Sequence, residues 1–181
     1  MSEEELAATF GRVGTNVLVD RSVRLVNPKN ITIGSNTRID LDAVLIAGTN
    51  PINIGSYIHI SYACHFSSAG GPILLEDFTS AASRVSIYTA TDDFREGFLI
   101  NPQVPFELRK VRGGPVIFRK HAVVGCGSVL LPEVELGFGA AVGALSLVNR
   151  SVERGIRVAG IPAKPIGTRD CNRLMQLEAQ I

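Results

Sequence analysis

Two kinds of side chain in this 181-residue chain are suited to moving a proton or holding a nucleophile. The chain has three histidines, His59, His65 and His121, and histidine is a side chain suited to taking the proton of an attacking hydroxyl group. The adjacent carboxylates Asp92 and Asp93 suit a different task, because a carboxylate can hydrogen-bond an ammonium group and orient the amine. An amine whose pKa lies about one to two units above 7 is already partly neutral, so it needs positioning more than deprotonation.

A repeat of six residues must position these side chains. Towards the C-terminus the repeat consists of the apolar residues Phe118, Val124, Leu130, Leu136, Val142 and Val148. The residues four places further on are small or β-branched, and they are Ala122, Ser128, Val134, Ala140, Ser146 and Val152. No ordinary helix or strand repeats every six residues. This spacing is the hexapeptide signature of a parallel β-helix.

The same phase extends backwards over nearly the whole chain. The earlier periodic residues are Ile33, Ile39, Leu45, Ile54, Ile60, Phe66, Leu75, Ala81 and Ile87, with weaker traces at Val13, Val19 and Leu25. Ile33, Ile54 and Leu75 stand 21 residues apart, three more than three hexads need, which predicts corner turns at residues 49–51 and 69–72.

Glycines mark further corners of the predicted β-helix. Gly125, Gly137 and Gly143 each follow a periodic apolar residue directly. A glycine at that place indicates a tight corner, where a side chain would clash or where φ must be positive.

One insertion and two short helices complete the predicted organisation. Residues 91–113 interrupt the repeat and return to it in phase, and a long loop inside a compact repeat is usually functional. Residues 1–10 predict a short helical turn. Residues 168–181 predict a helix with Thr168 or Asp170 as N-cap, which we expect to cap the open end of the coil. The prediction is one β-helix domain over residues 1–167, followed by this tail.

Composition favours a compact soluble domain and excludes several partners. The chain is 45% hydrophobic, so it can build a sizeable core. A net charge of +1 offers no field that would attract nucleic acid or an anionic membrane, and no apolar run reaches membrane-spanning length. Three cysteines, an odd number without paired spacing, indicate a reducing compartment, and we expect the protein in the cytoplasm.

The hexads of residues 33–152, the insertion and the ending Ala159-Gly160-Ile161-Pro162-Ala163-Lys164 together resemble the left-handed β-helix hexapeptide acyltransferases. Over residues 13–169 the layout is similar to that of galactoside and maltose acetyltransferases. The resemblance implies an all-β, left-handed parallel β-helix and a homotrimer with each active site in a cleft between adjacent coils. It also implies that acetyl-coenzyme A, or another acyl-coenzyme A, lies along the C-terminal turns.

The chain departs from those acetyltransferases at the catalytic position. Where they carry the general-base histidine, this chain has Asp92, followed by Asp93, and His65 stands before Phe66 where they have an asparagine. Members of the family that acylate the amino group of nucleotide-linked amino-deoxy sugars also have acidic residues there. The resemblance therefore implies an N-acyltransferase for surface polysaccharide or glycan biosynthesis, with Asp92, His65 and Asp93 as catalytic candidates. An O-acetyltransferase acting on a sugar hydroxyl is the alternative.

The resemblance also implies which residues contact the acyl donor. The candidates are Cys126, Ala144, Asn149, Arg150, Lys164 and Arg169. Lys164 and Arg169 offer cations for the phosphates of coenzyme A. Cys126 has no activating base near it in sequence, so we interpret it as a small structural residue and not as a nucleophile. The predicted reaction is direct: the amine held by Asp92 attacks the thioester, a backbone N–H near Cys126 stabilises the oxyanion, and His65 or water takes the proton.

Other interpretations of the same residues stay open. Asp92 and Asp93 are also typical turn formers, His65 can be a solvated or packed histidine, and the polar donor candidates can be surface residues. A zinc site like that of the γ-carbonic anhydrases is disfavoured, because His59 and His65 lie on different faces and His121 is expected at a solvated corner. A non-catalytic β-helix scaffold is the remaining alternative.

Overall fold

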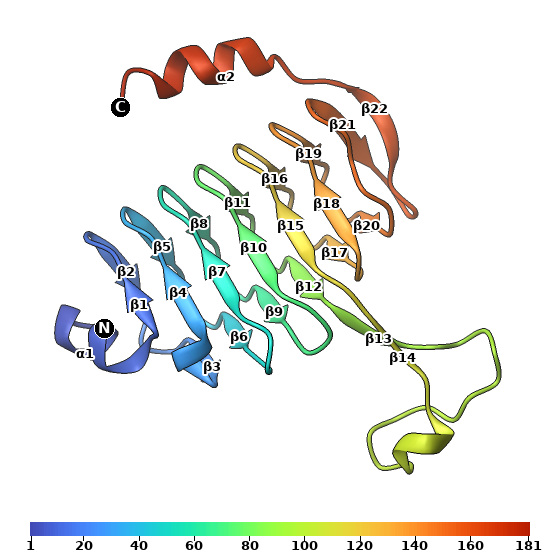
Figure 1. The fold of residues 1–181 in the computed structure, drawn as a ribbon. Coiled ribbons are helices and arrows are strands. Elements are labelled where there is room, and N and C mark those ends of the chain that lie inside the picture. Colours follow the sequence, from blue (N-terminus) through green and yellow to red (C-terminus); the bar gives the residue numbers. More distant parts are fainter.

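The computed structural model describes residues 1–181 and forms a parallel β-helix, in which three sheets surround one core (Figure 1). Sheet A contains β1 (Arg12–Val13), β4 (Ile31–Ile33), β7 (Ile52–Ile54), β10 (Ile73–Leu75), β15 (Val116–Phe118) and β18 (Val134–Leu136). Sheet B contains β2 (Val17–Val19), β5 (Thr37–Ile39), β8 (His59–Ile60), β11 (Ser80–Ala81), β16 (Val123–Val124), β19 (Ala141–Val142), β21 (Ile156–Ala159) and β22 (Lys164–Thr168). Sheet C contains β3 (Arg24–Val26), β6 (Val44–Ile46), β9 (His65–Ser67), β12 (Ser86–Tyr88), β17 (Val129–Leu130) and β20 (Leu147–Val148).

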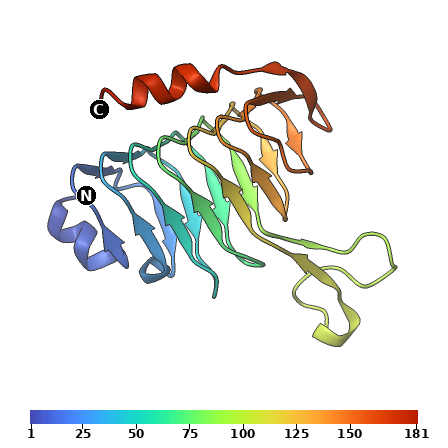
Figure 2. The ribbon, with the colours of Figure 1, turned by 45° about the horizontal axis from the view of Figure 1, so that its top comes forward.

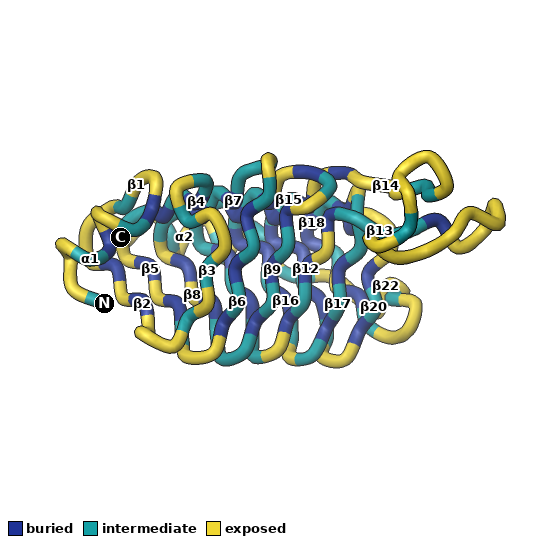
Figure 3. The backbone as a smooth tube through the Cα atoms, turned by 90° about the horizontal axis from the view of Figure 1, so that it is seen from below, coloured by how far each residue is buried: buried dark blue, intermediate teal, exposed yellow.

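The six-residue repeat fills the core as predicted. Strand pairing places Leu75 beside Phe118 and Phe118 beside Leu136 on successive turns of sheet A. Phe66 on sheet C is fully buried, and so is Ala122, a small residue four places after a periodic one. Burying a side chain such as Phe118 stabilises the fold by about 1.5–3 kcal/mol. In Figure 3 buried positions recur along every turn, which confirms the predicted parallel β-helix.

The corner glycines are explained by close approach and not by φ. At Gly125 two successive turns of the coil lie in close contact. A Cβ atom added to Gly125 would lie 2.5 Å from the backbone nitrogen of Ala144 on the following turn. Positive φ falls instead three places after the periodic residue, for example at Asn36, Tyr57 and His121. Of the two reasons predicted for glycine, only the steric one applies at Gly125, Gly137 and Gly143, because the left-handed conformation sits later in the corner.

Both terminal helices form, but the second does not cap the coil. Helix α1 (Glu3–Thr9) begins at the capping box of Ser2, and α2 (Cys171–Glu178) begins at Asp170, whose side chain accepts the N–H of Arg173. Figures 1 and 2 show α2 running back alongside the coil. The expected cap over the open end is therefore wrong, and the physical reason is that Glu178 hydrogen-bonds side chains of an earlier turn. No helix is both long and apolar enough to cross a membrane.

The insertion forms an arm that projects from the corner between sheets C and A (Figure 1). Its base is a hairpin of β13 (Ala90–Asp92) and β14 (Val111–Gly113), and a 3-10 turn, η2 (Phe106–Leu108), lies near its tip. A second 3-10 turn, η1 (Pro28–Asn30), precedes β4. The arm exposes large apolar side chains: Phe94 is 73% exposed and Phe106 is 79% exposed.

Candidate active site

A pocket of about 380 Å³ lies where the arm leaves the coil, and we call it the arm pocket. It is lined by Thr91, Asp92, Asp93, Phe94, Arg95, Arg112, Leu131, Pro132, Glu133 and Asn149. Both strands of the hairpin contribute, together with the corners that follow β17 and β20. The fold thus gathers acidic and basic side chains from distant parts of the sequence, and it brings together three of the predicted site residues, Asp92, Asp93 and Asn149.

The two adjacent aspartates have different surroundings. The side chain of Asp93 is 1% exposed, and its carboxylate accepts hydrogen bonds from the backbone N–H of Arg95 at 2.8 Å and from Arg112 Nε at 3.2 Å. These donors lower the pKa of Asp93, the Arg95 N–H most strongly and then Arg112. The carboxylate of Asp92 is half-buried and makes no hydrogen bond or ion pair within the protein. The Asp93 carboxylate therefore stabilises the arm, whereas the Asp92 carboxylate is available to bind a ligand.

His65 lies outside the arm pocket. It faces outwards from β9 on sheet C and is half-buried. Its ring packs against Tyr88 on the next turn, with centroids 5.4 Å apart and the planes tilted by 35°. Neither ring nitrogen has a hydrogen-bond partner among the protein's side chains or backbone, so the imidazole is available for proton transfer. Its catalytic role stays a prediction.

Cys126 and Ala144 stack at the corner between sheets B and C. The N–H of Leu145 donates to the carbonyl of Cys126 at 2.8 Å, and the N–H of Gly127 donates to the carbonyl of Ser83 at 2.9 Å. The backbone N–H groups of Cys126 and Ala144 donate to no acceptor in the protein. The Cys126 side chain is exposed, and no side chain hydrogen-bonds its thiol. This corner therefore presents unused backbone donors on two successive turns.

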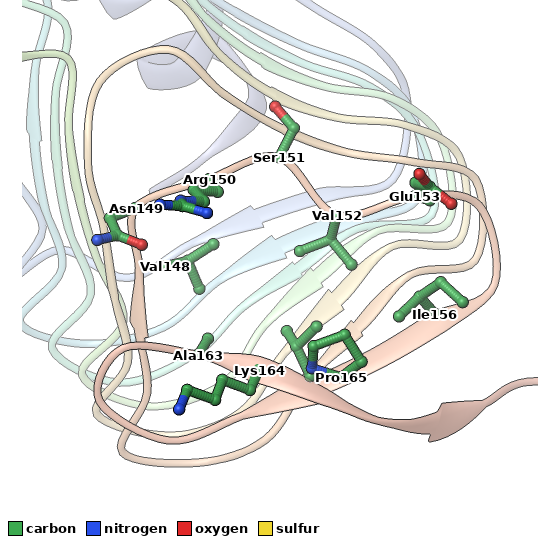
Figure 4. Close-up of a pocket in the computed structure, with 11 residues that line it drawn as sticks. Val148, Asn149, Arg150, Ser151, Val152, Glu153, Ile156, Ala163, Lys164 and Pro165 are labelled. Carbon is green, nitrogen blue, oxygen red and sulfur yellow. The ribbon is translucent and has the colours of Figure 1, made fainter.

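A second pocket, of about 410 Å³, lies at the C-terminal end of the coil (Figure 4). Asn149, Arg150 and Lys164 line it, three of the residues predicted to contact the acyl donor. Asn149 also lines the arm pocket, so the two pockets adjoin. Arg169 is not brought to either pocket: its guanidinium donates to the carbonyl of His121 at 2.8 Å.

The other two histidines do not join a site. His59 Nε2 lies 2.8 Å from a carboxylate oxygen of Asp40 on sheet B. His121 is only 7% exposed, so the prediction that it lies at a solvated corner is wrong. Its ring stacks on Phe78, and Nε2 lies 2.8 Å from Glu178 Oε2, because α2 folds back over this corner. No group of three or more histidine, cysteine or carboxylate side chains is arranged to hold a metal ion.

Both arginines of the arm pocket were absent from the sequence-based candidates. Arg112 donates a hydrogen bond to the carboxylate of Asp93. Arg95, two residues after Asp93 in the sequence, also lines the pocket. A signal was present, since both ends of the insertion carry charges of opposite sign: Asp93 and Glu96 at its start, Lys110 and Arg112 at its end. If the ends of the insertion are assumed to meet as a hairpin, these charges are predicted to pair, as they do.

Comparison with known proteins gives close relatives. Over 171 residues the chain is 41% identical to dTDP-4-amino-4,6-dideoxy-D-glucose acyltransferase of Escherichia coli. The aligned region covers 94% of this chain and 88% of the relative. A variant of AntD, an N-acyltransferase from Bacillus cereus, was solved in complex with dTDP-4-amino-4,6-dideoxyglucose and coenzyme A. The AntD structure is 35% identical in sequence to this chain and superposes with a TM-score of 0.94. The superposition covers 99% of this chain and 95% of the AntD chain.

A more distant structure shares the fold alone. A maltose O-acetyltransferase from Clostridium difficile 630 is 24% identical with a TM-score of 0.62, covering 93% of this chain and 74% of that one. No protein-family model matches the chain.

The hexapeptide coil and its inserted arm define an acyltransferase of the hexapeptide-repeat class. Within that class the extent of the identity is decisive, because it covers nearly the whole of both chains. The chain belongs to the sugar N-acyltransferase family that includes dTDP-4-amino-4,6-dideoxy-D-glucose acyltransferase. The prediction of an N-acyltransferase, drawn from Asp92 in the place of the family histidine, is confirmed.

Proposed function

We propose that this enzyme transfers an acyl group from acyl-coenzyme A to the amino group of a dTDP-linked 4-amino-4,6-dideoxyhexose. The observation that carries the proposal is the free carboxylate of Asp92 in the arm pocket, beside an aspartate whose own carboxylate is fully engaged. A free carboxylate suits an ammonium group. The amino sugar in the name of the E. coli relative, which is also the ligand bound in the AntD complex, carries one such group on a hexose linked to dTDP.

The reaction needs no covalent enzyme intermediate. Asp92 accepts a hydrogen bond from the sugar amine and orients its lone pair towards the thioester carbonyl. Attack forms a C–N bond and places negative charge on the carbonyl oxygen, and the unused N–H of Cys126 stabilises that charge. The C–S bond then breaks, and coenzyme A leaves as the thiolate, which takes up a proton from water. The proton lost from nitrogen passes to water or to His65, which faces outwards from sheet C.

In this proposal the acyl donor lies along the last turns of the coil. Cys126 and Ala144 offer backbone donors near the thioester, and Arg150 and Lys164 in the end pocket offer cations for phosphates. AntD has been solved with 3-hydroxybutyryl-CoA, so the acyl group extends in that relative beyond acetyl. An acyl-coenzyme A substrate and three free cysteines support a cytoplasmic enzyme, whose product enters polysaccharide or glycan assembly.

The working unit in this proposal is a homotrimer. Asp92 belongs to the corner between sheets C and A, whereas Cys126 belongs to the corner between sheets B and C, so sheet C separates them within one protomer. A cleft between two copies brings the two corners to one site. The exposed Phe94 and Phe106 of the arm support such packing, because apolar side chains so exposed in one protomer favour burial against another.

The experiment is an acceptor panel. Coenzyme A release is measured with acetyl-coenzyme A, nucleotide-linked amino sugars that differ in the amino position and the base, and simple hydroxyl acceptors such as maltose. Each product is tested with alkaline hydroxylamine, which cleaves oxygen esters and leaves amides intact. The proposal predicts turnover with a dTDP-linked 4-amino sugar and a hydroxylamine-resistant product. Turnover confined to hydroxyl acceptors contradicts it.

A further inference from the structure

One cation in the arm pocket has no partner. Arg95 lines the pocket, and its guanidinium makes no hydrogen bond, ion pair or cation–π contact in the protein. Two other basic side chains at the base of the arm are engaged: Arg112 pairs with Asp93, and Lys110 Nζ lies 2.6 Å from Glu96. A guanidinium without a partner in the protein is available to bind an anion.

The backbone of Arg95 is fixed although its side chain is free. Its N–H donates to the buried carboxylate of Asp93 at 2.8 Å, and the N–H of Asp93 donates to the carbonyl of Lys110 at 2.8 Å. These bonds join the start of the arm to its end. The guanidinium is therefore carried by a preformed turn, which lowers the entropy lost when a ligand binds.

Besides the paired Arg112 and Asp93, the arm pocket is lined by unpaired charges of both signs. Asp92 and Glu133 contribute carboxylates, and neither forms an ion pair with Arg95. A ligand that carries both an ammonium group and a phosphate group matches such a lining. A nucleotide-linked amino sugar is a ligand of this kind, with the amine at one side of the hexose ring and the diphosphate at the other.

The spacing of the two groups fits that ligand. Asp92 and Arg95 are three residues apart, so their Cα atoms lie at most about 10 Å from each other. We infer that Arg95 binds the diphosphate of the nucleotide-linked sugar while Asp92 holds its amine. Arg95 thereby makes the enzyme prefer nucleotide-linked amino sugars over free ones. This inference rests on the proposed function, since it assumes that the acceptor carries a diphosphate.

The test is direct binding of dTDP, which requires no turnover. Calorimetry is used to measure the Kd of the full-length protein for dTDP, for thymidine and for coenzyme A, in the wild type and in Arg95→Gln, Arg95→Lys and Arg21→Gln. Arg21 is a matched control, because it is an arginine at the N-terminal end of the coil, paired with Glu5 and far from the arm in sequence. Melting temperatures check that each variant is folded.

We expect Arg95→Gln to raise the Kd for dTDP about tenfold, which corresponds to about 1.4 kcal/mol, and Arg95→Lys to recover part of the loss. The Kd values for thymidine and coenzyme A stay within twofold of the wild type, and Arg21→Gln changes none of them. Equal dTDP affinity in Arg95→Gln and the wild type overturns the role of Arg95 and leaves the proposed function intact. A wild type that does not bind dTDP at all overturns both.

Discussion

Arg112 Nε lies 3.2 Å from a carboxylate oxygen of Asp93, and this contact joins the two ends of the arm. The contact is sheltered, since the Asp93 side chain is 1% exposed. Asp92, its neighbour in the sequence, has no such partner. Two carboxylates that look equivalent in the sequence thus have separate roles: Asp93 orders the arm and Asp92 faces the pocket.

Replacing Asp93 with asparagine is expected to loosen the arm in a pH-dependent way. The folded protein holds the pKa of Asp93 below its ordinary value of 3.8, chiefly through the Arg95 N–H and then Arg112. A lowered pKa means that the stabilisation is present above that ordinary value and is lost as the pH falls through the folded pKa. The wild type should therefore melt above Asp93→Asn at pH 7, and the difference should shrink below about pH 4. A difference in melting temperature that is the same at pH 3 and pH 7 contradicts this role.

Replacing Asp92 with asparagine removes the charge and keeps the shape of the side chain. Because the proposed role is to position an amine and offset its charge, kcat/KM for the amino-sugar acceptor should fall about 100-fold, with the KM for acyl-coenzyme A unchanged. The melting temperature should not change, since the carboxylate has no partner in the protein. Steady-state kinetics and a melting curve of Asp92→Asn check both points. Full activity in this variant removes Asp92 from the mechanism.

Gly125→Ala should be destabilising because the turns of the coil touch at this corner. The added Cβ would lie 2.5 Å from the backbone nitrogen of Ala144, a contact that only a backbone shift can relieve. We expect a loss of about 1–3 kcal/mol in the free energy of unfolding, measured by chemical denaturation. Gly48→Ala is the matched control: the nearest atom to its added Cβ is 3.3 Å away, and its neighbour needs to yield only slightly. Equal losses in the two variants would count against the steric explanation.

Glu178→Gln should release the C-terminal helix from the coil. The Glu178 carboxylate hydrogen-bonds the side chains of Lys120 and His121, and both lower its pKa, Lys120 more strongly. Loss of the charge weakens both contacts, so trypsin should cleave after Arg173 several times faster than in the wild type. Glu107→Gln is the control, because Glu107 forms no ion pair. Unchanged cleavage in Glu178→Gln would mean that other contacts hold the helix.

The sequence predicts what depends on local period and leaves open what depends on distant contacts. The inward positions of Phe66, Leu75 and Phe118 follow from the six-residue repeat, because the repeat itself determines which side chains face the core. The burial of His121 does not follow from it. The His121 side chain is covered by the helix that carries Glu178, 57 residues later in the sequence. The six-residue repeat does not predict where a terminal helix lies.

The candidate site shows the same division. The position of Asp92 at the start of the arm was evident from the point where the repeat breaks. The sequence does not predict that Asp93 is hydrogen-bonded and Asp92 is not. That difference depends on which of the two side chains points towards Arg112 when the two ends of the arm pair. The place of Arg95 in the pocket likewise depends on that closure.

The central claim is that the acceptor is an amine held by Asp92. The most direct measurement compares two acceptors that differ in one atom group: dTDP-4-amino-4,6-dideoxyglucose and dTDP-6-deoxyglucose, which carries a hydroxyl in place of the amine. Coenzyme A release from acetyl-coenzyme A is followed for both with the wild type and Asp92→Asn. The account predicts that kcat/KM for the amine exceeds that for the hydroxyl by at least about 100-fold, and that Asp92→Asn lowers the amine rate. Equal rates for the two acceptors, or faster turnover of the hydroxyl, would contradict it.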